Sequence, residues 1–216
     1  AAVQAGSGKS TTDATTYQNT HLNGDTINIT SKGDTTLRGA DAHANTINAD
    51  VSGKLAIESL QDDVTSASKD SGVNARVQVS FGSAWSASGG VNQSKANGNY
   101  TGVNQQSGLF AGDGGYHVTA DTVDLKGGAI ASTNAANSDL TANALTISHL
   151  QNEMHYDASS ASISGGFGGQ SGDGNGNTAG GSTFGAVNTG NFSGGLPSHE
   201  SGDDSSTTFG TLTDGH

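Results

Sequence analysis

The sequence predicts an all-β fold in which short strands coil into a stacked sheet, that is, a β-solenoid. Two observations carry this prediction. The composition is poor in helix-forming residues, and apolar residues recur at every second position in short runs. The runs themselves return after 18 to 20 positions, as from Ile29 to Ile47 and from Leu37 to Ile57. A period of about 20 residues with several short strands is typical of a coiled sheet rather than of a β-sandwich.

The composition excludes several classes of protein. The 216 residues include 34 Gly and 1 Met, whereas Lys and Arg together number only 8. Helical domains are rich in the residues that are scarce here, so a mainly helical fold is excluded. The net charge of −12 argues against a nucleic-acid partner and against binding to anionic membrane, because both need clustered basic side chains. The absence of Cys removes thiol chemistry and disulfide bonds.

The strands of the coil are expected to be three to five residues long, with tight turns such as Ser31 to Asp34 between them. One side chain in two then faces inward. The expected interior residues are Ile29, Leu37, Ile47, Leu55, Ile57, Val123, Leu125, Ile130, Leu140, Leu145 and Ile147.

A longer repeat is superimposed on the short one. The run from Ile57 to Asp62 resembles the run from Ile147 to Asn152, 90 positions later. We therefore expect two repeats, residues 22–115 and 116–216. Each repeat has a coil followed by an excursion: coil 22–65 with excursion 66–115, and coil 116–163 with glycine-rich excursion 164–216. The chain starts without Met, and we expect residues 1–216 to be one segment of a longer protein.

The two excursions differ. The first has apolar residues in alternation, from Val77 to Phe81 and again at Trp85, and its later part includes Leu109 and Phe110. This pattern predicts an antiparallel hairpin beside the coil. The second has apolar residues scattered among glycines, so we expect only part of it to be ordered. These residues are Phe167, Phe184, Val187, Phe192, Leu196 and Phe209.

The candidate catalytic and binding motifs are weak, and we expect no catalytic, cofactor or metal residue. Gly6 to Thr11 imitates a phosphate-binding loop, but Val3 stands where the first Gly of that loop is required. Residues 169–177 resemble one degenerate calcium nonapeptide, which cannot build a stacked calcium column. The seven His residues lack ligand spacing, and only His149 and His155 lie near each other.

Acidic residues remain as candidates for polysaccharide chemistry, since coiled β-sheets host such enzymes. Asp62 with Asp63, or Asp121 and Asp124 with Asp139, could supply paired carboxylates. A hydrolase also needs a cleft with aromatic walls, and the chain has one Trp and four Tyr. Turn formation by Asp is the simpler explanation.

The run from Val103 to Tyr116, followed by Val118 to Ile130, resembles the haemagglutinin repeat of filamentous-haemagglutinin-like exoproteins. It is most similar to the second repeat block of contact-dependent growth inhibition effectors. Leu196, Pro197 and residues 201–208 resemble the later part of the same repeat.

The resemblance implies a right-handed parallel β-helix (solenoid) with glycine-rich β-hairpin excursions. It also implies a secreted or cell-surface protein of a Gram-negative bacterium, which passes the periplasm and leaves through an outer-membrane two-partner-secretion transporter. In effectors the segment would help deliver a C-terminal toxin across the target-cell outer membrane, and the target partner is that membrane or a receptor in it. The alternatives are an adhesin stalk that binds host cells or matrix, and a polysaccharide-processing enzyme. Self-association at exposed filament edges is the remaining expected contact.

Overall fold

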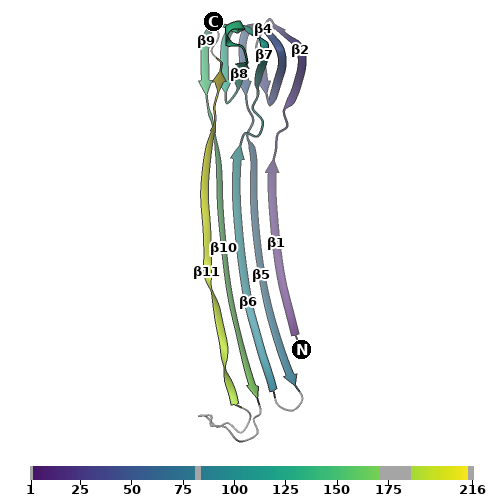
Figure 1. Ribbon diagram of the computed structural model, residues 1–216, viewed down its shortest axis with the longest axis vertical. Coiled ribbons are helices and arrows are strands. Elements are labelled where there is room, and N and C mark those ends of the chain that lie inside the picture. The colour runs from purple at the N-terminus through teal and green to yellow at the C-terminus, as the bar shows by residue number, and fades with distance from the viewer. Residues whose placement is uncertain (1, 81–83, 171–185, 214–216) are drawn as a thin grey trace. The chain divides into compact units, whose positions relative to one another are not determined.

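The structure is a computed structural model that describes residues 2–80, 84–170 and 186–213, and these residues are nearly all β-strand (Figure 1). The elements in chain order are β1 (Ala2–Thr15), β2 (Thr20–Ser31), β3 (Thr35–Arg38), β4 (Ala40–Glu58), β5 (Asp62–Ser80), β6 (Ala84–Gly102), β7 (Gly108–Lys126), β8 (Ala129–Ser132), the short 3-10 helix η1 (Ala135–Asn137), β9 (Asp139–Ser148), β10 (Leu150–Gln170), β11 (Ala186–Thr208) and β12 (Thr211–Leu212). The predicted all-β class is confirmed.

The first of two sheets has the strand order β12-β8-β7-β4-β2, with β3 paired to β4 and β9 paired to β7. The strand pairings described for this sheet are all parallel. Thr20 lies opposite Ala40, and Gly108 lies opposite Ala129, so these pairs of strands are about 20 residues apart in sequence, as the short repeat predicts. The central pair differs, because Asp41 of β4 lies opposite Gly108 of β7, 67 positions later. The sheet is open, because β2 and β12 stand at its two ends.

Several strands are longer than the three to five residues expected. β4 and β7 each span 19 residues, because pairing continues past points where the register shifts. Two such shifts lie between Ala44 and Thr46 and between Val51 and Lys54. A register shift lets one strand bend without ending, so the pairing continues through both points.

The second sheet has the order β1-β5-β6-β10-β11. Figure 1 shows β1, β5, β6 and β10 running in alternating directions, so this sheet is antiparallel where the first is parallel. β5 and β6 are the neighbours that the sequence predicted as a hairpin. The chain thus combines a parallel and an antiparallel sheet (Figure 1), and the parallel β-helix expected from the sequence remains a prediction.

Contacts divide the chain into two compact units. One comprises Ala1–Thr12, Ser66–Gly98 and Tyr156–Gly202, and the other comprises Asp13–Thr65, Asn99–His155 and Asp203–His216. The parallel sheet and the hydrophobic core lie in the second unit. The first unit consists of stretches of β1, β5, β6, β10 and β11.

The core is built from columns of apolar side chains that face each other across parallel strands. Ile27 lies opposite Ile47, which lies opposite Tyr116. A second column joins Leu37, Ile57 and Leu125. Each fully buried side chain of this size contributes roughly 1.5 to 3 kcal/mol. Because each apolar side chain stacks on another in the neighbouring strand, this mostly polar chain still forms an apolar core.

The expected interior list is correct at its centre and wrong at one edge. Ile47, Leu55, Ile57, Val123, Leu125 and Ile130 are fully buried, and Ile29, Leu37 and Leu140 are partly buried against them. Leu145 is 44% exposed and Ile147 is 40% exposed. Both belong to β9, whose described pairing is with β7. β7 therefore covers these side chains on one side, and no described strand pairing covers them on the other.

Other core residues were not expected. Leu109 was placed in the first excursion, but β7 begins at Gly108 and Leu109 is fully buried. Phe110 lies beside it in the same strand. Tyr116 and Val118 are also fully buried. Phe209 is 60% exposed, whereas the expectations for the side chains of Val77, Phe81, Trp85, Phe167, Phe184, Val187, Phe192 and Leu196 lie outside the described residues.

Two glycines shape equivalent corners of the parallel sheet. Gly39 has φ of 60° and Gly127 has φ of 56°, which is the left-handed region that other residues rarely adopt. A Cβ atom at either position would stand 2.7 Å from a leucine side chain, Leu60 or Leu150 respectively. The turn after a basic residue, Arg38 or Lys126, is therefore specified by glycine.

Candidate functional site

The most concentrated group of polar side chains surrounds Asp41 in β4. Its carboxylate is only 6% exposed. It accepts a hydrogen bond from Asn19 Nδ2 at 3.3 Å and pairs with His21 Nδ1 at 2.8 Å and His43 Nε2 at 3.1 Å. His21 lies directly opposite Asp41 in the register of β2 and β4. A buried carboxylate needs such donors, because an unpaired one would be strongly destabilising.

The surroundings of this group tie it to neighbouring segments of the chain. Asn19 also donates to the backbone carbonyls of Gln105 and Gln106, which links it to the segment before β7. The ring of His43 stacks on Phe110 with centroids 4.7 Å apart. Three donors already occupy the Asp41 carboxylate, so it is poorly placed to accept a proton from a substrate.

A second polar group forms an ionic ladder across three strands. Glu58 Oε2 pairs with Arg38 Nε at 3.2 Å, and Glu58 Oε1 pairs with Lys126 Nζ at 3.0 Å. Arg38 lies opposite Glu58 in the register of β3 and β4. The side chains of Arg38, Glu58 and Lys126 are 63%, 29% and 53% exposed, so each pair contributes little alone, on the order of 0 to 1 kcal/mol. Their alternating signs nevertheless favour this register over a shifted one.

The acidic residues considered for catalysis are held by separate partners. Asp62 is buried and accepts the backbone N–H of Tyr17 at 2.6 Å, whereas Asp63 is exposed and accepts from Thr101. These two residues are adjacent in β5, so their side chains point to opposite faces of the sheet. They do not form a carboxylate pair.

The other three acids show the same separation. Asp124 Oδ2 binds Lys54 Nζ at 2.6 Å, Asp121 accepts from Asn143 at 2.8 Å, and Asp139 pairs with His117. Each of these contacts crosses from one strand to its neighbour. The carboxylates therefore serve strand pairing, and no described contact brings two of them together.

Histidine–aspartate pairs are the feature that sequence reasoning missed. Besides the Asp41 group, His117 pairs with Asp139, His155 with Asp203, and His199 with Asp157. His149, in contrast, accepts the backbone N–H of Gly210 and contacts the edge of the Phe209 ring. His21 and Asp41 are 20 residues apart, and His117 and Asp139 are 22 apart, so the rung spacing itself carried the signal.

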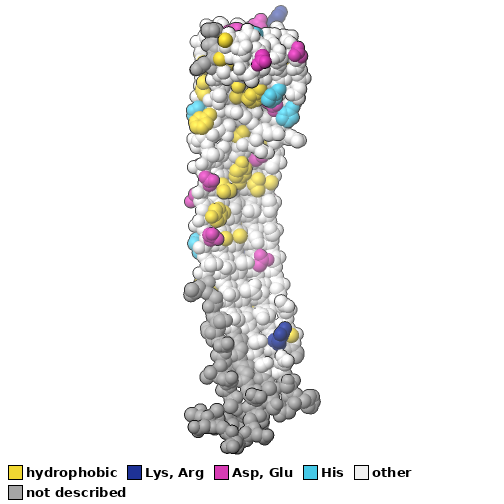
Figure 2. All heavy atoms as spheres, in the orientation of Figure 1, with side chains coloured by type: hydrophobic (Ala, Val, Ile, Leu, Met, Phe, Trp, Pro, Cys, Tyr) yellow, Lys and Arg dark blue, Asp and Glu magenta, His cyan; other side chains and the backbone are white. Residues whose placement is uncertain are grey.

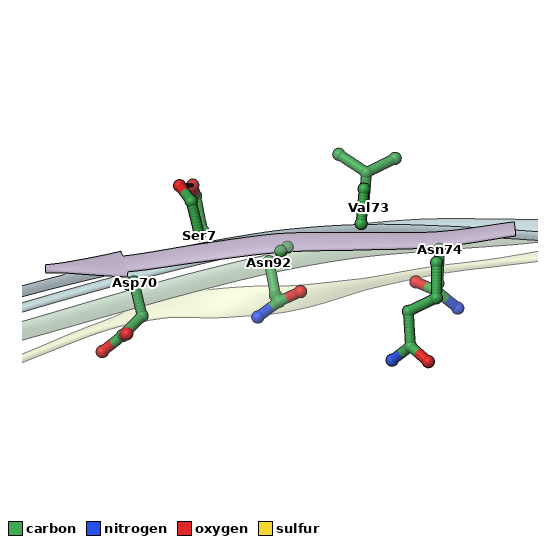
Figure 3. Close-up of a pocket in the computed structure, with 11 residues that line it drawn as sticks. Ser7, Asp70, Val73, Asn74 and Asn92 are labelled. Carbon is green, nitrogen blue, oxygen red and sulfur yellow. Dashed lines mark hydrogen bonds between the residues drawn. The ribbon is translucent and has the colours of Figure 1, made fainter.

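An open groove of about 430 Å³ lies in the unit that contains most of β1 and β5. It is lined by residues 4–8, residues 70–74 and Asn92. Figure 3 shows Ser7 and Val73 on one face of the sheet, and Asp70, Asn74 and Asn92 on the other. The run expected to imitate a phosphate loop is here an exposed strand, so its N–H groups do not converge on one point.

The described part of the surface gives no sign of an ion or nucleic-acid site. Figure 2 shows acidic side chains scattered over this face, with few basic ones. Among the described residues, no group of three or more His, Asp or Glu side chains is arranged to hold a metal ion. Residues 171–185, which include most of the calcium-like run, lie outside the described residues. No helix in the described ranges has the length and apolar character needed to span a membrane.

Comparison with known proteins gives a consistent set of relatives. The hemagglutinin repeat matches residues 1–73. Toxin CdiA of Escherichia coli is 37% identical over 169 residues, which cover 76% of this chain. tRNA nuclease CdiA of E. coli strain NC101 is 34% identical over 222 aligned positions, which cover 100% of this chain. Deoxyribonuclease CdiA of Dickeya dadantii strain 3937 is 34% identical over 166 residues, which cover 74%. No solved structure matches.

The matched stretch is a small part of each relative. It spans 5% to 6% of their length, so the nuclease and toxin names describe much longer proteins. The resemblance inferred from residues 103–130 is confirmed by these matches. Residues 1–73 match the hemagglutinin repeat, and the chain as a whole is homologous to one stretch of the CdiA proteins.

Proposed function

We propose that this chain is a structural filament segment of a secreted bacterial exoprotein that helps deliver a C-terminal toxin across the target-cell outer membrane in contact-dependent inhibition. One observation carries the proposal: the whole chain aligns with a stretch of a CdiA protein at 34% identity. The polar groups support it, because Asp41, Glu58 and Asp124 are each engaged in contacts between strands. They act as structural residues, and the segment itself has no catalytic role.

The parallel sheet is the proposed filament axis. β2 pairs with β4 and β7 pairs with β9 at offsets of about 20 residues, and apolar side chains stack in columns across these strands, as successive turns of a right-handed parallel β-helix would. β4 and β7 join the two repeats by pairing across the first excursion. The two proposed repeats are residues 22–115 and 116–216. Each contains strands of the parallel sheet and a pair of antiparallel strands, β5 with β6 in the first and β10 with β11 in the second, and β7 crosses the boundary between them (Figure 1).

The proposed setting is the bacterial cell surface. The exporting partner is an outer-membrane two-partner-secretion transporter, and the receiving partner is the target-cell outer membrane or a receptor in it. The alternative is an adhesin stalk, which needs the same filament but presents binding sites to host cells or matrix. The two roles differ in what is lost when the segment is removed.

A chimera separates them. In E. coli CdiA, the stretch that aligns with this chain is replaced by the chain, and in a second variant that stretch is deleted. Delivery predicts that the deletion variant still binds target cells but no longer inhibits them, and that the chimera restores inhibition. An adhesin stalk predicts that the deletion lowers binding itself. A chimera carrying a scrambled segment of equal length controls for spacing alone.

A further inference from the structure

The outer edge of β1 is a long unpaired strand edge. In the described part of the chain, β1 has β5 on one side and stands at the end of the five-stranded sheet. All 14 of its residues are exposed. An edge of this length presents a row of free N–H and C=O groups, which is the requirement for pairing with another strand.

The order of strands shows what kind of neighbour this edge fits. β6 leads into β7 of the parallel sheet, and β1 leads into β2 in the same way. β6 has an antiparallel neighbour on both sides, β5 and β10. β1 has the equivalent place in the chain, but only one of the two neighbours. The open side of β1 therefore corresponds to the side of β6 that pairs with β5.

The edge of β1 has few of the features that proteins use to block strand addition. Its charged side chains are Lys9 and Asp13, and it contains no Pro. The other outer strand, β11, contains Pro197, the one Pro of the chain. Pro lacks an N–H group and interrupts pairing at an edge, so the two ends of this sheet are not equivalent.

Small residues in β1 leave room for the side chains of a neighbour. An added Cβ at Gly8 would collide with the carboxylate of Asp70 on β5, so that side chain occupies the space above the glycine. Gly72 gives Asn92 of β6 the same room, since a Cβ there would stand 2.6 Å from Asn92 Oδ1. A polar strand that carries Asn or Asp between glycines therefore packs well in this sheet.

We propose that the outer edge of β1 is a strand-acceptor site, and that its occupant is an extended, polar, glycine-containing strand of the β5 type, added antiparallel. Main-chain hydrogen bonds supply the affinity. In this arrangement, the antiparallel hairpins of successive repeats join edge to edge into one continuous sheet, as β6 and β10 already do. The proposal stands independently of toxin delivery.

The test uses the full chain and a synthetic peptide with the sequence of residues 62–80. Amide hydrogen exchange is measured with and without the peptide. The peptide should bind saturably and slow exchange at least tenfold at alternate amides of β1, those that face away from β5. Amides of β11 should not change. Slowing at β11 or in the parallel sheet without slowing at β1 would overturn the proposal.

Two control peptides test the mode of binding. One is a scramble of the same composition, and the other carries Ser66→Pro, Lys69→Pro, Gly72→Pro and Ala75→Pro, which prevent pairing along either edge. Each should bind at least tenfold more weakly than the parent peptide. Equal binding by either control overturns strand addition. Slowing of the β1 amides with rising chain concentration, without peptide, would identify a second copy as the occupant and overturn the β5-type assignment.

Discussion

Leu125 and Ile147 lie opposite each other in the register of β7 and β9, yet Leu125 is fully buried and Ile147 is 40% exposed. Leu125 is enclosed because Ile57 lies opposite it on the other side, in β4. Two apolar residues in the same column thus differ in burial according to whether a strand lies on both sides of them or on one side.

This difference predicts unequal costs of truncation. Leu125→Ala should lower the free energy of unfolding by about 2 to 5 kcal/mol, because it removes buried methyl groups and leaves a cavity. Ile147→Ala should cost clearly less, since its side chain is already partly in water. Urea unfolding followed by circular dichroism measures both. Equal losses would mean that β9 is covered by something other than β7.

The glycine corners give a second prediction with an internal control. Gly39→Ala and Gly127→Ala should each destabilise the fold by about 1 to 3 kcal/mol, since both need a positive φ and both place a Cβ against a leucine. Gly33→Ala is the control, because a Cβ there meets nothing within 4 Å. Thermal unfolding should show Gly33→Ala within about 0.5 kcal/mol of the parent chain. A shift as large as that of Gly39→Ala would contradict the steric explanation.

The sequence could predict the columns of the core because the rung spacing is visible in the chain. Leu37 and Ile57 are 20 residues apart, and β3 and β4 pair in parallel at this spacing. It could not predict that Leu145 and Ile147 are exposed, because periodicity reports which face a residue lies on and not whether a further strand covers it.

The excursions limited the prediction in another way. Leu109 follows a polar, glycine-containing stretch, so its neighbourhood resembled the excursion more than the core. The histidine–aspartate pairs were missed because spacing was compared with helices and single strands. Contacts such as His117 with Asp139 join two strands, and they become visible only when the chain is aligned rung by rung.

The Asp41 group yields a third prediction. Asp41→Asn removes a buried charge that Asn19, His21 and His43 all contact, and leaves polar atoms with a poorer partner. The expected loss is about 1 to 3 kcal/mol in the free energy of unfolding. Asp139→Asn is the matched control, because Asp139 also pairs with a histidine across strands but is 48% exposed. Its loss should be below about 1 kcal/mol. A reversed order of the two variants would refute the role assigned to burial.

The last prediction concerns the enzymatic alternative. The purified chain should release no unsaturated or reducing products from a panel of acidic polysaccharides. Asp124 is held by Lys54 at 2.6 Å, and Asp121 and Asp139 have separate partners, so no described pair of carboxylates faces a common substrate position. Product formation that Asp124→Asn abolishes would establish catalysis and overturn the structural assignment. Product formation that survives Asp124→Asn would place catalysis elsewhere and overturn it equally.

To separate chemistry from folding, Lys54→Met serves as a companion variant, because it removes the same ion pair while leaving the carboxylate in place. If Asp124→Asn and Lys54→Met change only stability, and by similar small amounts, the pair acts between strands as the geometry indicates.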